Sequence, residues 1–263
     1  MKPNGHIHQH IQGARVVAFG ISDTGRIRDE NQDAILLDED GHFLLLADGM
    51  GGHERGEVAS FTSLQVIQEY LQPDKILSEL HEVTRVEGVP LKVISILSLV
   101  DKSISKANSV LYNLNKKEGL ERYMGSTIVG LIWVEEDHIV WFHVGDSRLY
   151  RLRGSELKSL TVDHSAYTQW VLSGKEGPEP GKNIVTRAVG PREGVIPEIK
   201  FGKCREGDLY LLCSDGLNDM ITEKQISHVL NSGKDLETMA QELIGLANNA
   251  GGHDNISVIV SRF

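Results

Sequence analysis

The chain of 263 residues carries 27 lysines and arginines against 37 aspartates and glutamates, so its formal net charge is −10. Hydrophobic residues make up 40% of it, which is enough for a substantial core in one large domain or two small ones. The negative charge disfavours binding of nucleic acid through a basic surface, so we expect no nucleic-acid partner.

The sequence predicts a protein without targeting or membrane segments. The N-terminus lacks the apolar stretch of a signal peptide, and the longest mostly apolar run, residues 91–100, is too short to cross a bilayer. Residues 1–13 are polar, with His6, His8 and His10 in alternation, and we expect them to form a flexible tail. A cytoplasmic protein with no membrane partner is the prediction.

The two cysteines, Cys204 and Cys213, both fall in apolar segments. We interpret them as buried thiols in a reducing compartment. Tyr210 and Asp219 lie six residues after them, where a thiolate phosphatase would carry arginine. A cysteine-based mechanism is therefore not indicated.

Hydrophobic periodicity divides the chain into short strands, linked mostly by hairpins, and two groups of helices. The expected elements are strands at 14–21, 34–37 and 42–47, helices at 56–72 and 91–117, strands at 126–134, 139–144, 149–153 and 156–160, a short helix within 161–174, strands at 196–201 and 208–213, helices at 222–233 and 235–250, and a strand at 256–260. The Gly- and Pro-rich residues 174–183 belong to a short flap at about 161–186.

Hairpin linkage indicates antiparallel sheets. Two such sheets packed face to face, each covered by a pair of helices, would bury every apolar stripe. The predicted fold class is therefore α+β, a four-layer α/β/β/α sandwich formed by a single domain over residues 14–263.

The centre of the pattern is residues 44–53, where an apolar run ends abruptly in Asp48 and is followed by glycines and a histidine. The run reads as a buried strand. The glycines favour a tight turn with positive φ at its end. Such a turn would leave Asp48 at the rim of a sheet.

Four other aspartates border apolar strands in the same way. Asp146 and Asp215 follow strands, whereas Asp33 and Asp254 precede them. Antiparallel pairing places the end of one strand beside the start of the next, so all five carboxylates, that of Asp48 included, can meet at one rim. Like charges at short range repel, so the cluster predicts bound cations, and oxygen ligands suit Mg²⁺ and Mn²⁺. Taken singly, each Asp-Gly could instead be an ordinary turn.

Six segments occur in one order along almost the whole chain. They are Arg28-Asp29-Glu30-Asn31-Gln32-Asp33, Asp48-Gly49-Met50-Gly51-Gly52-His53, Gly125-Ser126-Thr127, Val144-Gly145-Asp146-Ser147-Arg148, Ser214-Asp215-Gly216-Leu217 and Asp254-Asn255-Ile256-Ser257. Together they resemble the metal-dependent protein phosphatases of type 2C in their bacterial form. The resemblance implies a β-sandwich flanked by helix pairs and a two-metal centre that hydrolyses phosphoserine and phosphothreonine.

The resemblance also implies a ligand set for two core ions, Mn²⁺ or Mg²⁺. Asp48 would bridge both ions, and Gly49 would ligate one of them through its carbonyl oxygen. Asp215 and Asp254 would complete the shell of the other ion. Asp33 would hold metal-bound water.

A third, more weakly held ion is implied at Asp146, with Asp215 shared and Asp219 as a possible helper. This carboxylate is separated along the chain from the ligands of the core ions, so it extends the predicted centre to a further strand end.

Two residues are implied in substrate chemistry. Arg28 would grip the substrate phosphate through its planar fork, with a surface ion pair to Asp29 or Glu30 as the alternative. His53 is either the acid that protonates the departing alkoxide or a structural histidine beside the glycine turn. Gln32 stands where some relatives have glutamate, which would leave the second ion held more by water.

Neighbouring polar residues are given structural roles. Thr127 and Ser147 are interpreted as hydrogen-bonding turn residues, because no base adjoins either one. His143 is interpreted as a core or edge histidine, and His164 as a residue that makes local hydrogen bonds.

The predicted function is that of a metal-dependent protein serine/threonine phosphatase. Its hypothetical mechanism is direct in-line attack by a metal-bridging hydroxide, without a phosphoenzyme. We expect a monomer that acts in bacterial signalling on phosphorylated proteins and opposes a Ser/Thr protein kinase.

Two other functions fit the sequence less well. A catalytically weak relative that acts as a binding or sensing module is disfavoured by the intact set of carboxylates. A two-metal phosphodiesterase or nuclease is disfavoured by the acidic charge and by the lack of interleaved aromatic and basic residues.

Overall fold

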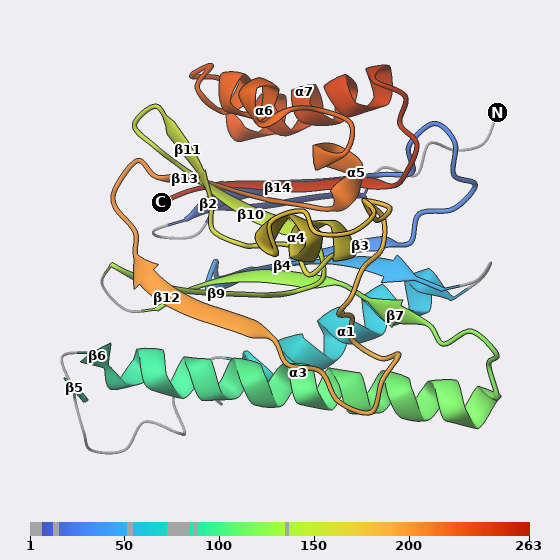
Figure 1. Ribbon diagram of the computed structural model, residues 1–263. Helices are drawn as coiled ribbons and strands as arrows, with labels where there is room; N and C mark the ends of the chain where they lie inside the picture. Colours follow the sequence, from blue (N-terminus) through green and yellow to red (C-terminus); the bar gives the residue numbers. More distant parts are fainter. Residues whose placement is uncertain (1–6, 13–15, 52–54, 73–84, 87–88, 135–136) are drawn as a thin grey trace.

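Two sheets lie face to face at the centre of the molecule, with helices on both outer faces (Figure 1). The computed structural model describes residues 7–12, 16–51, 55–72, 85–86, 89–134 and 137–263. The strands are β1 (Ile7–Gln12), β2 (Val17–Asp23), β3 (Asp33–Leu37), β4 (Phe43–Met50), β5 (Arg85–Val86), β6 (Val89–Pro90), β7 (Gly125–Ser126), β8 (Ile128–Trp133), β9 (His138–Val144), β10 (Arg148–Arg153), β11 (Glu156–Ser159), β12 (Glu198–Lys203), β13 (Leu209–Cys213) and β14 (Ile256–Arg262). The helices are α1 (Gly56–Tyr70), α3 (Leu91–Glu118), α4 (Ala166–Leu172), α5 (Asp215–Asn218), α6 (Glu223–Leu230) and α7 (Leu236–Asn249).

Both large sheets are antiparallel. The first has the strand order β1-β2-β14-β13-β10-β11, and the second has the order β12-β9-β8-β4-β3, with β7 also paired to β4. A separate two-stranded ladder joins β5 and β6. Hairpins connect neighbours such as β3 with β4 and β8 with β9, as the short predicted loops require.

Strand β4 shows why the apolar run is continuous rather than alternating. Leu44 and Leu46 face the layer between the two sheets, whereas Phe43, Leu45 and Ala47 pack toward α1 and α3. All five side chains are fully buried. A strand covered on both faces must be apolar at every position, and β4 meets that condition up to Asp48.

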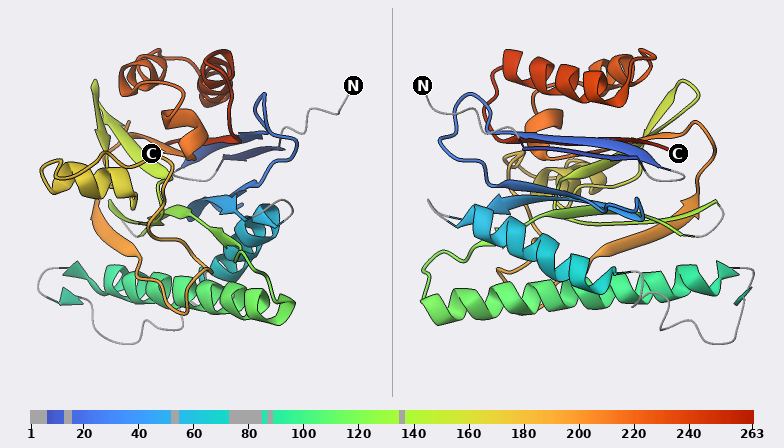
Figure 2. Two further views of the ribbon diagram at one scale, coloured as in Figure 1. Left: turned by 45° about the vertical axis from the view of Figure 1, so that its right-hand side comes forward. Right: turned by 180° about the vertical axis from the view of Figure 1, so that it is seen from behind.

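Three apolar layers hold the elements together. The first packs α6 and α7 onto one sheet, the second lies between the sheets, and the third packs α1 and α3 onto the other sheet. The two helix groups lie on opposite sides of the sandwich in both views of Figure 2. The predicted α/β/β/α sandwich is confirmed, and both cysteines are free and buried as expected. Among the described helices, none is long and apolar enough to span a membrane.

Residues 7–12 are a correction to the predicted tail. They form β1, the edge strand beside β2, with Ile11 buried. The side chain of Gln9 ties β1 to the second sheet, because its amide donates to the carbonyl of Ile35 (3.2 Å) and its oxygen accepts from the amide of Leu37 (2.8 Å). The polar residues misled the prediction, since they pair by backbone and amide bonds rather than by apolar burial. The remainder of the predicted tail lies outside the described residues.

The link from α3 to β7 depends on one buried amide. Asn115 donates to the carbonyl oxygens of Met124 (2.8 Å) and Gly190 (3.2 Å) and accepts from the amide of Met124 (2.9 Å). Its side chain is fully buried, so these backbone groups have no access to water in its absence. The helix end, β7 and the segment around Gly190 are thereby joined.

We expect Asn115→Ala to lower the free energy of unfolding by about 2–4 kcal/mol, because it strands buried backbone groups. The melting temperature should fall by about 5–10 °C in a thermal unfolding scan. The exposed Asn113→Ala, on the same helix, is the matched control and should change it little. Equal melting temperatures for the two variants would contradict the role of Asn115.

Candidate metal centre

Asp33 and Asp48 are direct partners at one end of the β3–β4 ladder. Asp33 is only 6% exposed, and its Oδ2 accepts a hydrogen bond from the hydroxyl of Ser214 (2.8 Å), which lies just after β13 on the other sheet. The predicted meeting of a strand start with a strand end is therefore confirmed for this pair. The hydroxyl of Ser214 bridges the two sheets at the same point.

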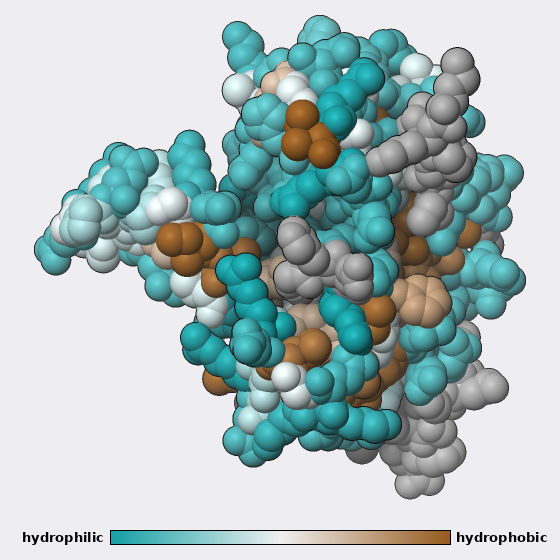
Figure 3. Space-filling model, turned by 90° about the vertical axis from the view of Figure 1, so that its right-hand side faces the viewer, coloured by the Kyte–Doolittle hydropathy of each residue, from teal (hydrophilic) through white to brown (hydrophobic). Residues whose placement is uncertain are grey.

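The other strand-end aspartates converge on the same end of the sandwich. Asp146 follows β9, Asp215 opens α5 directly after β13, and Asp254 precedes β14. These three line one cavity of about 710 Å³ together with Asp48, Gly49 and Arg28. Figure 3 shows the molecule from the right-hand side of Figure 1. The residues on that face are mostly hydrophilic.

Of the other two predicted residues, one lies outside the cavity lining and one cannot be placed. Asp33 stands behind Asp48 as its ladder partner, and its backbone and side chain are tied to neighbouring polar groups. His53 lies outside the described residues, so its proposed acid role stays a prediction.

Burial and mutual repulsion make these carboxyls hard to ionise without cations. Burial raises the pKa of Asp33 and of Asp146 to about 6, against an ordinary value near 4. Burial also raises the pKa values of Asp48 and Asp215 well above the usual range, and the charges of the surrounding aspartates raise them further. The acids that share this end of the sandwich therefore oppose one another's ionisation.

One oxygen of Asp215 gives the most direct sign of what the cavity accepts. Its Oδ1 is buried and has no hydrogen-bond partner among the described residues. A buried carboxylate oxygen without a donor is costly unless a cation faces it. The donor set of carboxylates and backbone carbonyls fits a hard divalent cation.

Thr127 fixes the backbone of Asp48. Its hydroxyl oxygen accepts from the Asp48 amide (3.0 Å), and its own amide donates to the Asp48 carbonyl (2.8 Å). The same hydroxyl lies 2.7 Å from that of Ser147, next to Asp146. The hydrogen-bonding roles predicted for Thr127 and Ser147 are confirmed, but only the fold shows that they connect two aspartates.

Gly49 is needed for close approach rather than for a turn. The expected positive φ is absent at Gly49 and Gly51, and β4 continues to Met50. A Cβ on Gly49 would lie 1.9 Å from the carbonyl oxygen of Gly56 and 2.7 Å from that of Gln32. The prediction of a positive-φ turn was wrong at these two residues because a crowded backbone, which a sequence does not reveal, imposes the glycine.

Asn255 joins the loop before β3 to the loop before β14. Its side-chain oxygen accepts from the amide of Gln32 (2.8 Å), and its amide donates to the carbonyls of Thr24 and Glu30 (both 2.9 Å). Gln32 in turn accepts from the amide of Gly49 (3.1 Å). In the sequence, only the position of Asn255 beside Asp254 indicates such a role.

Arg28 lies at the cavity and pairs with Asp254, with 2.7 Å between Nη2 and Oδ2. The arginine side chain is 54% exposed, so part of its guanidinium faces solvent. This partner differs from the neighbouring acids that the sequence offered. An anion that enters the cavity therefore meets a guanidinium beside the carboxylates.

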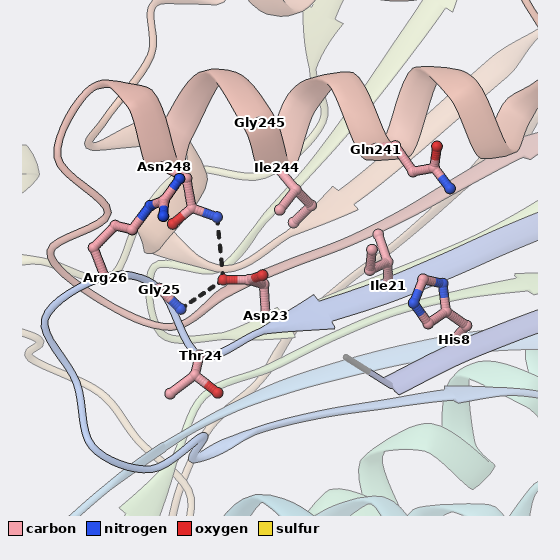
Figure 4. A pocket seen from close by; sticks show the side chains of 10 residues that line it. All are labelled: His8, Ile21, Asp23, Thr24, Gly25, Arg26, Gln241, Ile244, Gly245 and Asn248. Atoms are coloured by element: carbon pink, nitrogen blue, oxygen red, sulfur yellow. Dashed lines mark hydrogen bonds between the residues drawn. The ribbon is translucent and has the colours of Figure 1, made fainter. Parts of the chain in front are cut away.

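A second cavity, of about 420 Å³, lies between the loop after β2 and α7 (Figure 4). Oδ1 of Asp23 accepts there from the Gly25 amide (2.7 Å) and from the side-chain amide of Asn248 (3.1 Å). The Arg26 amide donates to the Gly252 carbonyl (2.8 Å). These bonds anchor the segment that leads to Arg28.

His143, His164 and Glu198 form another group of possible ligands. The imidazole rings stack at 4.4 Å with planes only 12° apart. Nearly parallel rings direct their lone pairs into separate planes, so their nitrogens do not converge on one ion. Nε2 of His143 lies 2.9 Å from the Val162 carbonyl, and Nδ1 of His164 accepts from the Gly145 amide (3.1 Å), which confirms local structural roles.

Comparison with known proteins agrees with this fold. Residues 26–251 match the family described as protein phosphatase 2C. Protein phosphatase PhpP of Streptococcus pneumoniae is 32% identical over 249 residues, which cover 90% of this chain and 94% of the relative. The structure of the Mycobacterium tuberculosis serine/threonine phosphatase PstP/Ppp is similar with a TM-score of 0.79 at 30% identity, covering 94% of this chain and 98% of that one.

A further structure, of the PstP catalytic domain in complex with two manganese ions, is similar with a TM-score of 0.78 at 31% identity, covering 94% and 97% of the two chains. The two-sheet sandwich with an acid-lined cavity thus defines a phosphatase domain, and the chain belongs to the protein phosphatase 2C family. It is a protein serine/threonine phosphatase.

The raised pKa values predict that the metal-free protein loses stability as the pH rises. Asp33 and Asp146 have pKa values of about 6 when folded, above the value of about 4 of an unfolded chain. The folded state therefore holds extra protons, and the stability they contribute is present below about pH 4 and lost as the pH rises through about 6. We expect the melting temperature of chelator-treated protein to fall by about 5 °C or more between about pH 5 and pH 7.

The matched variant is Asp33→Asn, which removes one of these titrating groups and should flatten the slope. A saturating divalent cation should oppose the loss at the higher pH, because it neutralises the acids. A melting temperature of the metal-free protein that rises over the same interval would contradict the prediction.

Proposed function

We propose that this phosphatase removes phosphate from phosphoserine and phosphothreonine in proteins with Mn²⁺ or Mg²⁺ held at the cavity. The observation that carries the proposal is the convergence of buried and half-buried aspartates on one cavity, with an oxygen of Asp215 left without a partner among the described residues. The relative solved with two manganese ions supports the choice of metal.

We propose Asp48, the carbonyl of Gly49, Asp215 and Asp254 as ligands of two core ions. Each lines the cavity, and the charges of Asp215 and Asp254 raise the pKa of Asp48. Asp33 adjoins this group as the ladder partner of Asp48 and is proposed to hold metal-bound water.

Asp146 is proposed as the ligand of a third, weaker ion. Asp146 lines the same cavity, and the charge of Asp219, just after α5, contributes to its raised pKa. Asp219 is outside the cavity lining, so we assign it a supporting electrostatic role.

When bound, a pair of divalent ions supplies an acidified water and positive charge toward the phosphoryl oxygens, and direct attack by a bridging hydroxide is the mechanism we propose. The residues of the chain set the geometry. Thr127 holds the backbone of Asp48, and Ser214 holds the carboxyl of Asp33. Arg28 is proposed to bind the substrate phosphate, and His53 to protonate the departing alkoxide.

The cellular setting is also a proposal. Two free, buried thiols support a reducing compartment such as the cytoplasm. Phosphorylated proteins are the substrates of such an enzyme, and an opposing Ser/Thr protein kinase must supply them. We propose that the chain acts as a monomer in bacterial signalling.

The function is tested by hydrolysis of a phosphothreonine peptide with Mn²⁺, in parallel with a phosphodiester. We expect peptide hydrolysis to stop on chelation, and Asp48→Asn to lower kcat/KM on the order of a hundredfold or more, because a bridging carboxylate is lost. The melting temperature checks that the variant folds. Unchanged activity of Asp48→Asn would remove the bridging role, and faster cleavage of the diester would favour a phosphodiesterase.

Arg28→Lys tests the phosphate-binding role. Lysine keeps the charge but loses the bidentate fork, so we expect KM for the peptide to rise by about tenfold with kcat nearly unchanged. The measurement is a full steady-state curve at saturating Mn²⁺. A large fall in kcat at constant KM would show that Arg28 acts in the transition state instead of in uniform binding.

A further inference from the structure

Arg122 brings a second guanidinium to the cavity from a different part of the chain. α3 ends at Glu118, and Gly119 with φ of 63° turns the chain back. The amide of Leu120 donates to the carbonyl of Asn115 (3.3 Å), and the residues that follow run to the cavity, which Arg122 and Tyr123 both line. Arg122 thus borders the same space as the aspartates.

The segment that carries Arg122 is held at both ends. Met124 is fully buried, and both polar groups of its peptide backbone bond to the side chain of Asn115. The ring of Tyr123 packs edge-on against that of Tyr112, with 6.0 Å between the centroids. The anchored backbone therefore holds the Cα of Arg122 beside the cavity that its side chain lines.

The charge of Arg122 is unused by the part of the chain that the structure describes. Arg28 is paired with Asp254, whereas Arg122 makes no hydrogen bond or ion pair with any described residue and is exposed. An uncommitted cation in a chain of net charge −10 is available to an incoming anion.

The geometry points to Arg122 as a specificity-determining residue that binds the carboxylate of an acidic side chain near the phosphorylated residue of the substrate. A guanidinium fork fits a carboxylate bidentately. Arg28, beside Asp254, is placed for the phosphate itself, so the two arginines serve separate anions. The inference concerns substrate selection by the phosphatase and rests on the proposed phosphate-binding role of Arg28.

The other wall of the cavity suits an extended peptide. Asn183, Ile184 and Val185 line it, and Ile184 is 49% exposed. A peptide that enters this cavity also meets Arg122 and Tyr123, which line it too. The surrounding face is mostly hydrophilic (Figure 3), as recognition of a polar peptide requires.

The test compares phosphothreonine peptides that are identical except for one residue, in which a single glutamate or glutamine is walked through the positions on either side of the phosphothreonine. For the wild type we expect one position at which glutamate raises kcat/KM about fivefold over glutamine. Arg122→Ala should abolish this ratio, mainly through KM, and leave the glutamine peptides and p-nitrophenyl phosphate unaffected. Arg122→Glu should instead favour lysine at the same position.

Lys158→Ala is the matched control, because it removes an exposed cation on β11, outside the cavity lining, and should leave the ratio unchanged. If the wild type does not hydrolyse p-nitrophenyl phosphate, the proposed function fails. This activity is measured separately from the glutamate-to-glutamine ratio of the peptides. An equal loss for all substrates in Arg122→Ala would mean that Arg122 binds the phosphate and would overturn the inference. A glutamate preference that survives Arg122→Ala would overturn it as well.

Discussion

The repulsion among buried aspartates at one end of the sandwich is the constraint on which the structure depends. Antiparallel strands from both sheets stop or start there, and several of them carry an aspartate at that end. Burial and the neighbouring charges raise the pKa values of Asp33, Asp48, Asp146 and Asp215. Ionised acids at this site destabilise the folded state when no cation is bound. Bound cations relieve the repulsion, so the fold favours metal binding.

Neutral polar groups hold the acids without cancelling their charge. Thr127 bonds the backbone of Asp48, Ser214 bonds the carboxyl of Asp33, and Asn255 ties together the loops that precede two strands. Hydroxyls and amides of this kind fix orientation and leave carboxylate oxygens open toward the cavity. Arg28 pairs with Asp254 and remains half exposed, so part of its guanidinium can also reach an anion in the cavity.

The predictions that were wrong concern elements that depend on tertiary contacts. β1 is polar and was expected to be a tail, yet it pairs with β2 and is pinned by the amide of Gln9. Gly49 was expected at a turn, but the approach of Gly56 is what excludes a side chain. In both cases the deciding contact is made with a neighbouring element, β2 and β3 for β1 and the start of α1 for Gly49, and periodicity carries no information about it.

The sequence by itself determined most of the strands, the longer helices and the strand-end positions of the aspartates, because apolar period and chain reversal are local properties. It also predicted that the five acids would share one rim, since antiparallel pairing requires it. Only the tertiary structure decided that Arg28 meets Asp254 and that Arg122, unremarkable in the sequence, borders the same cavity. Arg28 and Asp254 are 226 residues apart in the chain. Both contacts with the cavity depend on how two sheets and a long helix pack in three dimensions.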